Sequence, residues 1–354
     1  MSQLVTDLKY RIPGRYLASW GALAALLIVV VIAVPVTLQS NGIRIATVLA
    51  GVLALATLGQ MLIVMLGAID LSVSAIITVA AGMVVHYGTP GSNTFLVIVG
   101  TIAVTVGITI INWLLISVFR LNSIIVTLGM LGVIGGGIII WTGASFSASG
   151  QAPQAIKNFS TGSWLNISTC FLVAVAAAIV LALVLSKTRG GRQVAAIGAN
   201  RRAARLQGMR VARIEFAAFV GAGLFYGLAG ILVAGFLGQP GVDVGNPYQL
   251  LTITAVAIAG ASFSGGPASV AGVLVACLFL QLLDQAMALY GFSGGLRVAV
   301  RGVALVLAVS AITLSQFALN GARRRSAGAA QKVSGNLTTA EESSTPASHT
   351  KETS

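Results

Sequence analysis

Charge is what this sequence lacks most. Only 8% of its 354 residues are Asp, Glu, Lys or Arg, and 56% are hydrophobic, whereas a soluble globular protein has about 25% charged residues. This composition cannot cover a surface that faces water, so most of the surface must face lipid. In lipid, only helices and closed barrels satisfy their backbone groups. The apolar runs are continuous and do not alternate, which predicts an all-α, polytopic membrane helical bundle.

The residues that serve soluble enzymes are also scarce. Cys170 and Cys277 fall in apolar segments far apart in the chain, which favours core positions over a disulfide. The two histidines, His86 and His349, are widely separated, and there is no HExxH or CxxC spacing. None of the five lysines follows a glycine, so the chain has no Walker A sequence with which to bind ATP. We therefore expect no catalytic residue, metal ion or cofactor in this chain.

Apolar segments of membrane-spanning length account for most of the chain. The third and eighth segments are short or interrupted by glycine, and these two we expect to be broken or re-entrant helices. We predict about ten transmembrane helices, at approximately residues 17–38, 45–66, 71–88, 95–119, 122–142, 167–186, 214–237, 249–263, 268–289 and 298–317.

The distribution of basic residues predicts the orientation. A net charge of +13 is explained better by the positive-inside rule than by nucleic-acid binding. With the N-terminus inside and ten spans, 17 of the 21 Lys and Arg residues are cytoplasmic. We therefore expect a cytoplasmic segment over 1–16, a transmembrane domain over 17–317 with a basic cytoplasmic loop at 187–213, and a disordered cytoplasmic tail over 318–354.

Two acidic residues lie in apolar surroundings, where charge is costly and often functional. Asp70, in "MLGAIDLSVSAI", can cap the start of the next helix together with Ser72 and Ser74. We favour this structural role over contact with a substrate. Asp284, in "FLQLLDQAMAL", can pair with Arg301 on a neighbouring helix, and we favour that pair over a proton relay.

The segment Gly191–Glu215 carries six arginines between apolar stretches. Asn200 is a good N-cap and Gly208 a good residue to follow a helix, so "RRAARLQ" predicts about two helical turns with Ala203 and Leu206 on one face. This short helix could dock on a soluble partner. It could equally be a basic loop that lies against anionic membrane lipid.

Four stretches, in order, resemble the permease family of sugar ABC importers of the ribose, xylose, arabinose and galactose types. "GAIDLSVS" (67–74) is similar to GGIDLSVG, and "IIVTLGM" (124–130) is similar to FIVTLGM. Residues 191–209 are similar to GRxxYAIGGNxxAARLSGI. The stretch that begins "QPGVDVGNPYQL" at Gln239 is similar to QPGAGxGYELDA and continues through "GGPASVAG". The similarity extends over nearly all of residues 45–317.

The resemblance implies the membrane pore of an ATP-driven importer in a bacterial plasma membrane. A separate ATPase subunit would use ATP and Mg, an extracytoplasmic binding protein would deliver the solute, and a second permease copy or paralogue would complete the pore. The residues that the family would use to couple to the ATPase are Ile197, Gly198, Asn200, Ala203, Ala204, Arg205, Leu206 and Gly208. Candidates for the translocation pathway or for helix breaks are Asp70, Ser72, Thr127, Gly129, Ser262, Gly265 and Gly266.

Two departures from the family pattern affect the expected solute. "VIGGG" stands where the family has an arginine after the fifth span's motif, and Leu251–Thr252 stands where it has an aspartate. The pathway is therefore expected to be more apolar, and the solute need not be a standard pentose or hexose. The resemblance itself implies a monosaccharide as the expected cargo. The related nucleoside or branched-chain amino acid branch is the nearest alternative. An ion-coupled secondary transporter that uses Asp70 or Asp284, and a membrane scaffold without transport activity, are the other readings of the sequence.

Overall fold

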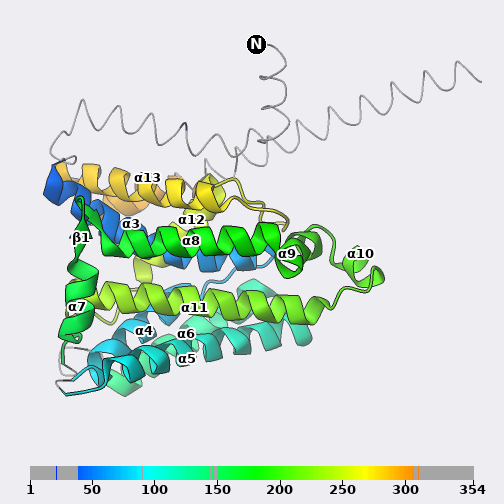
Figure 1. Ribbon diagram of the computed structural model, residues 1–354, viewed down its shortest axis with the longest axis horizontal. Coiled ribbons are helices and arrows are strands. Elements are labelled where there is room, and N and C mark those ends of the chain that lie inside the picture. Colours follow the sequence, from blue (N-terminus) through cyan, green and yellow to red (C-terminus); the bar gives the residue numbers. More distant parts are fainter. Residues whose placement is uncertain are drawn as a thin grey trace, which may run out of the picture. The chain divides into compact units, whose positions relative to one another are not determined.

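The computed structural model describes residues 39–303, except for 90, 144–145 and 147–149, together with 21, 305, 306 and 310. This part of the chain is almost entirely helical (Figure 1). Its one small sheet is an antiparallel hairpin of β1 (Ser163–Trp164) and β2 (Ile167–Ser168). The helices are α3 (Ser40–Met65), α4 (Val73–Tyr87), α5 (Thr94–Trp113), a π-helical turn (Leu114–Val118), α6 (Ser123–Thr142), α7 (Gln154–Thr161), α8 (Thr169–Lys187), α9 (Arg189–Ala199), α10 (Arg201–Leu206), α11 (Val211–Leu237), α12 (Asn246–Ile258) and α13 (Val270–Leu289).

Helix α3 forms the centre of the bundle. It packs against α8, α11, α12 and α13, and nearly every residue from Ala46 to Met65 is buried. A helix that is apolar all round finds its lowest free energy inside a bundle. Its 26 residues extend for about 39 Å, which exceeds the thickness of about 30 Å of a bilayer's hydrocarbon core.

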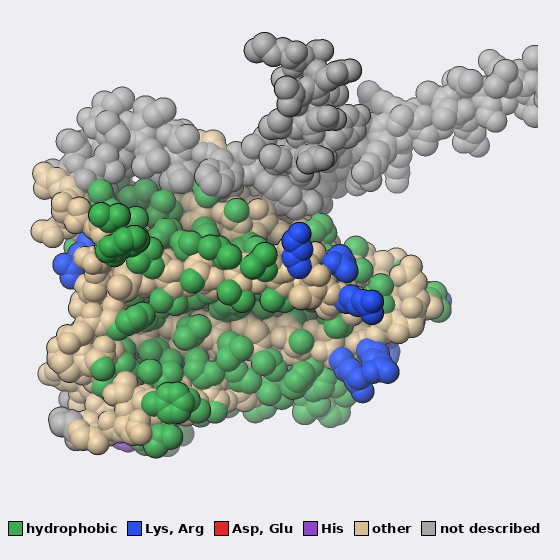
Figure 2. Space-filling view, in the orientation of Figure 1, with side chains coloured by type: hydrophobic (Ala, Val, Ile, Leu, Met, Phe, Trp, Pro, Cys, Tyr) green, Lys and Arg blue, Asp and Glu red, His purple; other side chains and the backbone are tan. Residues whose placement is uncertain are grey.

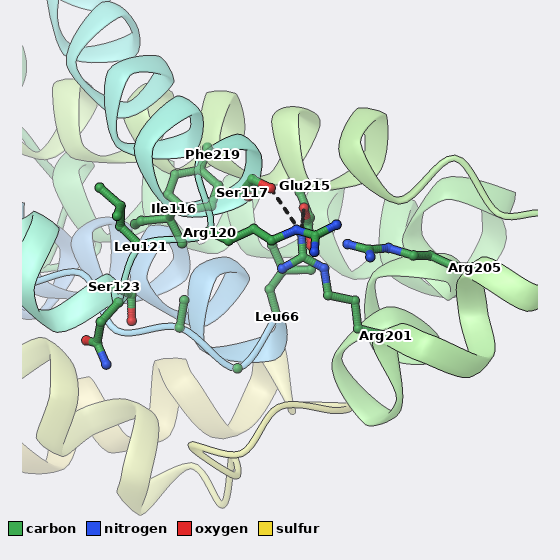
Figure 3. A pocket seen from close by; sticks show the side chains of 13 residues that line it. Leu66, Ile116, Ser117, Arg120, Leu121, Ser123, Arg201, Arg205, Glu215 and Phe219 are labelled. Carbon is green, nitrogen blue, oxygen red and sulfur yellow. Dashed lines mark hydrogen bonds and ion pairs between the residues drawn. The ribbon is translucent and has the colours of Figure 1, made fainter.

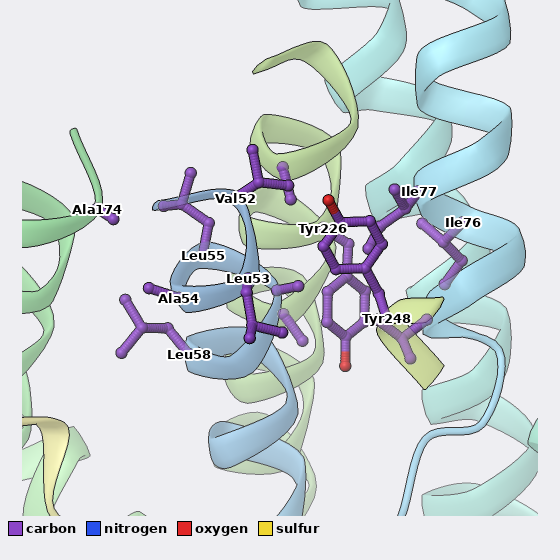
Figure 4. Close-up of a cluster of buried hydrophobic side chains, with 14 of the residues drawn as sticks. Val52, Leu53, Ala54, Leu55, Leu58, Ile76, Ile77, Ala174, Tyr226 and Tyr248 are labelled. Carbon is purple, nitrogen blue, oxygen red and sulfur yellow. The ribbon is translucent and has the colours of Figure 1, made fainter. Parts of the chain in front are cut away.

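Close helix contacts in the core depend on small residues. Tyr226 of α11 is fully buried, and Figure 4 shows it beside Val52 and Leu53 of α3 and near Tyr248 of α12. A Cβ on Gly59 of α3 would lie only 2.6 Å from the Tyr226 ring. The absence of that side chain therefore lets α3 and α11 approach each other, as is usual between helices in membranes.

Within the described residues, six helices are long and apolar enough to cross a membrane: α3, α5 with its π-helical turn, α6, α8, α11 and α13. The all-α membrane bundle is therefore as expected. The expected span 17–38 lies outside the described residues, apart from 21, and the span 298–317 is described only at 298–303, 305, 306 and 310. The two spans expected to be short are α4, with 15 residues, and α12, with 13. Their lengths of about 22 and 20 Å are less than the hydrocarbon thickness.

Both short helices begin inside the bundle. The linker 66–72 separates α3 from α4 and contains Gly67 at φ +80°. The loop 238–245 precedes α12, and the Gly245 N–H at its end donates to Thr78 Oγ1 of α4, with an N···O distance of 3.0 Å. The start of α12 therefore lies against the first turns of α4 and not at the end of the bundle.

The sides and the ends of the bundle differ in character. Figure 2 shows hydrophobic side chains along α8 and α11, with Lys and Arg gathered at the end that carries α9 and α10, called here the α10 end. The opposite end carries α7 and is called the α7 end. Large apolar side chains such as Ile125, Val133, Ile140 and Val180 are exposed. A face of this kind suits lipid and not water.

Candidate coupling site and helix breaks

The basic segment forms two short helices at the α10 end. Asn200 has extended backbone dihedrals and separates α9 from α10. Its side-chain oxygen accepts from the Ala203 N–H at an O···N distance of 2.9 Å, which satisfies one free donor of the first helical turn. After α10, Gly208 takes φ +75°, a conformation that glycine adopts without the strain that a Cβ would cause. The predicted N-cap and the predicted terminating glycine are both confirmed.

Helix α10 has an anchored side and a free side. Ala204 is buried and packs with Ile197 and Val211, and Leu66 at the end of α3 also contacts this cluster. On the free side, Leu206 is 83% exposed, and Arg202 and Arg205 are also exposed. Leu206 therefore does not help to anchor α10, and it adds an apolar group to a basic surface.

Three distant segments meet, backbone against backbone, where α9 ends. The Gly266 N–H, in the linker 259–269 between α12 and α13, donates to the Met65 carbonyl oxygen at 3.0 Å. A Cβ on Gly198 would lie 1.7 Å from that same oxygen, and a Cβ on Gly265 would lie 2.5 Å from the Gly198 oxygen. No real side chain fits at such distances, so glycine at 198 permits the contact. The end of α9 thus touches two breaks between helices, at the end of α3 where the linker 66–72 begins and in the linker 259–269 that follows α12.

The first of these breaks is held by polar groups. Ser123 and Thr127 of α6 bond its backbone: Ser123 Oγ accepts from the Ile69 N–H at 3.3 Å, and Thr127 Oγ1 accepts from the Leu71 N–H at 3.0 Å. On the other side, the Gln60 amide lies within hydrogen-bond distance of the Asp70 backbone and of the Tyr226 hydroxyl. These contacts replace the helical hydrogen bonds that the break removes, as non-helical backbone at membrane depth requires.

Asp70 is completely buried inside this network. One of its carboxylate oxygens accepts from both the N–H and the hydroxyl of Ser72, and Asn112 of α5 donates to Ser72 Oγ at 2.9 Å. No side chain caps the first turn of α4 directly, so Asp70 orders the residue before the helix and not the helix itself. Among the described residues, Asp70 forms no ion pair. The carboxylate of Asp70 therefore makes its hydrogen bonds to Ser72, two residues further along the chain.

A cavity of about 440 Å³ is lined by residues of the first break, of α10 and of α11. Figure 3 shows Arg120, Arg201 and Arg205 gathered around Glu215 at its wall. Arg201 forms an ion pair with the buried Glu215 at 2.7 Å and reaches the Ser117 carbonyl oxygen at 3.4 Å. With three guanidinium groups and one carboxylate, the lining is net positive. The ion pair also connects α10 directly to α11.

The remaining residues predicted for the pathway or for an intramembrane ion pair do not line this cavity. Ser262 accepts from the Ser264 N–H and shapes the linker 259–269. A Cβ on Gly129 would meet no atom within 4 Å, so this glycine lies on an open face of α6. Asp284 of α13 forms ion pairs with Arg301 and, at 3.4 Å, with Arg297.

The Asp284 cluster is separate from the α10 end. The neighbouring Gln285 side chain donates to the Gly42 oxygen, at the opposite end of α3.

Sequence reasoning missed Gln60, Asn112, Arg201 and Glu215. Of these, only Glu215 gave a signal, as the one acidic residue in the basic segment.

Comparison with known proteins identifies the class. Residues 42–309 match the family described as branched-chain amino acid transport system / permease component. The chain is 32% identical over 271 residues to the L-arabinose ABC transporter permease protein of Azospirillum brasilense, covering 76% of this chain and 78% of the relative. It is 29% identical over 251 residues to the ribose import permease protein of Bacillus subtilis, covering 71% of this chain and 78% of the relative.

A third relative is the L-arabinose transport system permease protein of Escherichia coli, 30% identical over 314 residues, or 84% of this chain and 90% of the relative. No solved structure matches significantly. The chain therefore belongs to the branched-chain amino acid transport system / permease component family. It is a multi-pass membrane permease and not an enzyme, and its resemblance to sugar ABC permeases is confirmed.

Proposed function

We propose that this permease forms the pore of an ATP-driven importer for a monosaccharide in the plasma membrane of a bacterium. Two of its relatives are named as an L-arabinose ABC transporter permease and a ribose import permease, which supports a monosaccharide. An extracytoplasmic binding protein would deliver the sugar at the α7 end. A second permease, identical or paralogous, would complete the pore.

The α10 end would face the cytoplasm and bind an ABC ATPase, which uses ATP and Mg. The orientation rests on the basic residues of α9 and α10, because the positive-inside rule places such loops in the cytoplasm. The exposed Arg202, Arg205 and Leu206 offer charge and an apolar anchor to a groove on the ATPase. An exposed apolar side chain flanked by arginines suits a partner surface better than water.

The observation that carries the coupling role is the contact of Gly198 with Met65 and with Gly265. A displacement of α9 and α10 acts directly on the linkers 66–72 and 259–269, because their backbones touch with no side chain between them. The first linker sets where α4 begins, and the second sets where α12 ends. Closure of the ATPase would therefore shift two short helices and so change the side of the membrane to which the pathway is open. ATP would favour the permease state that binds the closed ATPase better.

Reconstitution tests this function. The permease, its ATPase and its binding protein are placed in proteoliposomes, and uptake of labelled L-arabinose and D-ribose is measured with and without ATP. We expect uptake of at least one monosaccharide that requires ATP and the binding protein. Uptake of an amino acid or a nucleoside instead would overturn the substrate. Uptake that persists without ATP and collapses with an ion gradient would overturn the importer mechanism.

A further inference from the structure

An apolar groove runs between α8 and α11 on the face shown in Figure 2. Its volume is about 500 Å³. Val180, Val184 and Leu185 line it from α8, and Ala217, Leu224 and Leu228 line it from α11. At the α10 end, it closes on Thr188, Gly190 and Gly191, where α8 passes into α9.

The dimensions of the groove indicate the shape of its occupant. Its lining on α11 extends from Ile214 to Leu228, a rise of about 21 Å along the helix. This length exceeds the depth of about 15 Å of one hydrocarbon leaflet, so the groove is long enough for an acyl chain that lies along it.

Basic side chains surround the mouth of the groove at the α10 end. Lys187 and Arg189 flank the lining residue Thr188, and both are exposed. The Arg192 guanidinium donates to the carbonyl oxygens of Ser186 and Lys187, which holds it beside the end of α8. Within the described part of the chain, none of these three cations forms an ion pair with a carboxylate. Three cations thus stand at the mouth of an otherwise apolar groove.

We propose that this groove binds an anionic phospholipid of the cytoplasmic leaflet. One acyl chain would lie between α8 and α11, and the phosphate would lie among Lys187, Arg189 and Arg192. The long apolar lining and the cationic mouth match the two parts of such a lipid, and the cytoplasmic leaflet is the one rich in anionic headgroups. The proposal rests on the orientation proposed above, in which the α10 end faces the cytoplasm, but it does not depend on the proposed contacts with the ATPase.

Bound lipid would also act on the structure near the coupling segment. Val194 of α9 and Ile214 of α11 line the groove beside Gly191, so an acyl chain would fill the space between α8, α9 and α11. A ligand that binds only the folded state raises stability by mass action. Phosphatidylglycerol should therefore raise the thermal midpoint of the purified permease more than phosphatidylcholine does.

Native mass spectrometry of the full-length permease with added phosphatidylglycerol or phosphatidylcholine tests the site. We expect retained phosphatidylglycerol in the wild type. The triple variant Lys187→Gln, Arg189→Gln, Arg192→Gln should weaken its binding about 100-fold, since each cation near a membrane surface contributes about fivefold. Ala217→Trp should abolish retention by filling the groove. The controls are Lys157→Gln, which lines a different cavity at the α7 end, and Ala176→Trp, which is exposed on α8 outside the groove.

Three results would overturn the proposal. The first is equal retention of the two lipids by the wild type. The second is a control variant that loses lipid as readily as its matched partner. The third is a photoreactive group in place of Ala217 that crosslinks in native membranes to a second permease copy or to residues 17–38, because protein would then occupy the groove. Each readout is independent of transport, so the lipid site and the importer function can fail separately.

Discussion

Gly198 stands so close to Met65 that a methyl group on Gly198 would lie 1.7 Å from the Met65 carbonyl oxygen. Gly198 lies in the last turn of α9, and Met65 is the last residue of α3, the central helix of the bundle. The contact has no side chain that could absorb a small movement. A shift at α9 must therefore move the end of α3 or break the contact.

The free face of α10 is expected to carry the binding energy for the ATPase. Arg202→Glu reverses an exposed charge on this face and should weaken binding of the ATPase at least about tenfold, as is typical of an interface hot spot. Equilibrium binding of the ATPase to the purified permease measures the effect. Lys157→Glu at the α7 end is the control for charge reversal. Normal binding by Arg202→Glu would remove this face from the interface.

The ion pair between Arg201 and Glu215 is expected to stabilise the position of α10. Arg201→Ala leaves the buried Glu215 carboxylate without its partner and should cost about 2 kcal/mol, less than a fully buried pair because Arg201 is 38% exposed. The thermal midpoint in detergent should fall accordingly. The double variant Arg201→Met, Glu215→Met should recover most of the loss, and Arg202→Ala, which is exposed, should leave the midpoint unchanged. A double variant no better than Arg201→Ala would refute this account.

Asp70 is expected to matter for structure more than for substrate choice. Asp70→Ala removes the acceptor for the Ser72 N–H and hydroxyl and leaves buried donors unpaired, which should cost about 1–3 kcal/mol. Asp70→Asn keeps an acceptor oxygen and should retain more stability. Abundance, thermal midpoint and sugar preference of both variants are the measurements. An Asp70→Asn protein of normal abundance with a changed sugar preference would show instead that Asp70 contacts the substrate.

Local signals in the sequence predicted the local features well. Asn200 and Gly208 defined α10 because caps act within a few residues, and the short apolar run after Asp70 indicated a broken span. The contact of Gly198 with Met65 and Gly265 could not be predicted, because backbones that meet from distant parts of the chain leave no periodic pattern. Asn112 and Gln60 were missed for a related reason. Each is a single polar residue in an apolar helix, and its partner is known only once the bundle is assembled.

The central claim is that α9 acts on the helix breaks through Gly198, and a pair of glycine variants tests it most directly. Gly198→Ala and Gly190→Ala both add one methyl group to α9, but the new Cβ at 190 meets its first neighbour only at 3.9 Å. ATP-dependent sugar uptake, ATPase binding and thermal midpoint are measured for both in proteoliposomes or detergent. Gly198→Ala should bind the ATPase yet lose uptake at least about tenfold, the equivalent of about 1.4 kcal/mol, while Gly190→Ala transports normally. A folded Gly198→Ala protein with wild-type uptake would contradict the claim.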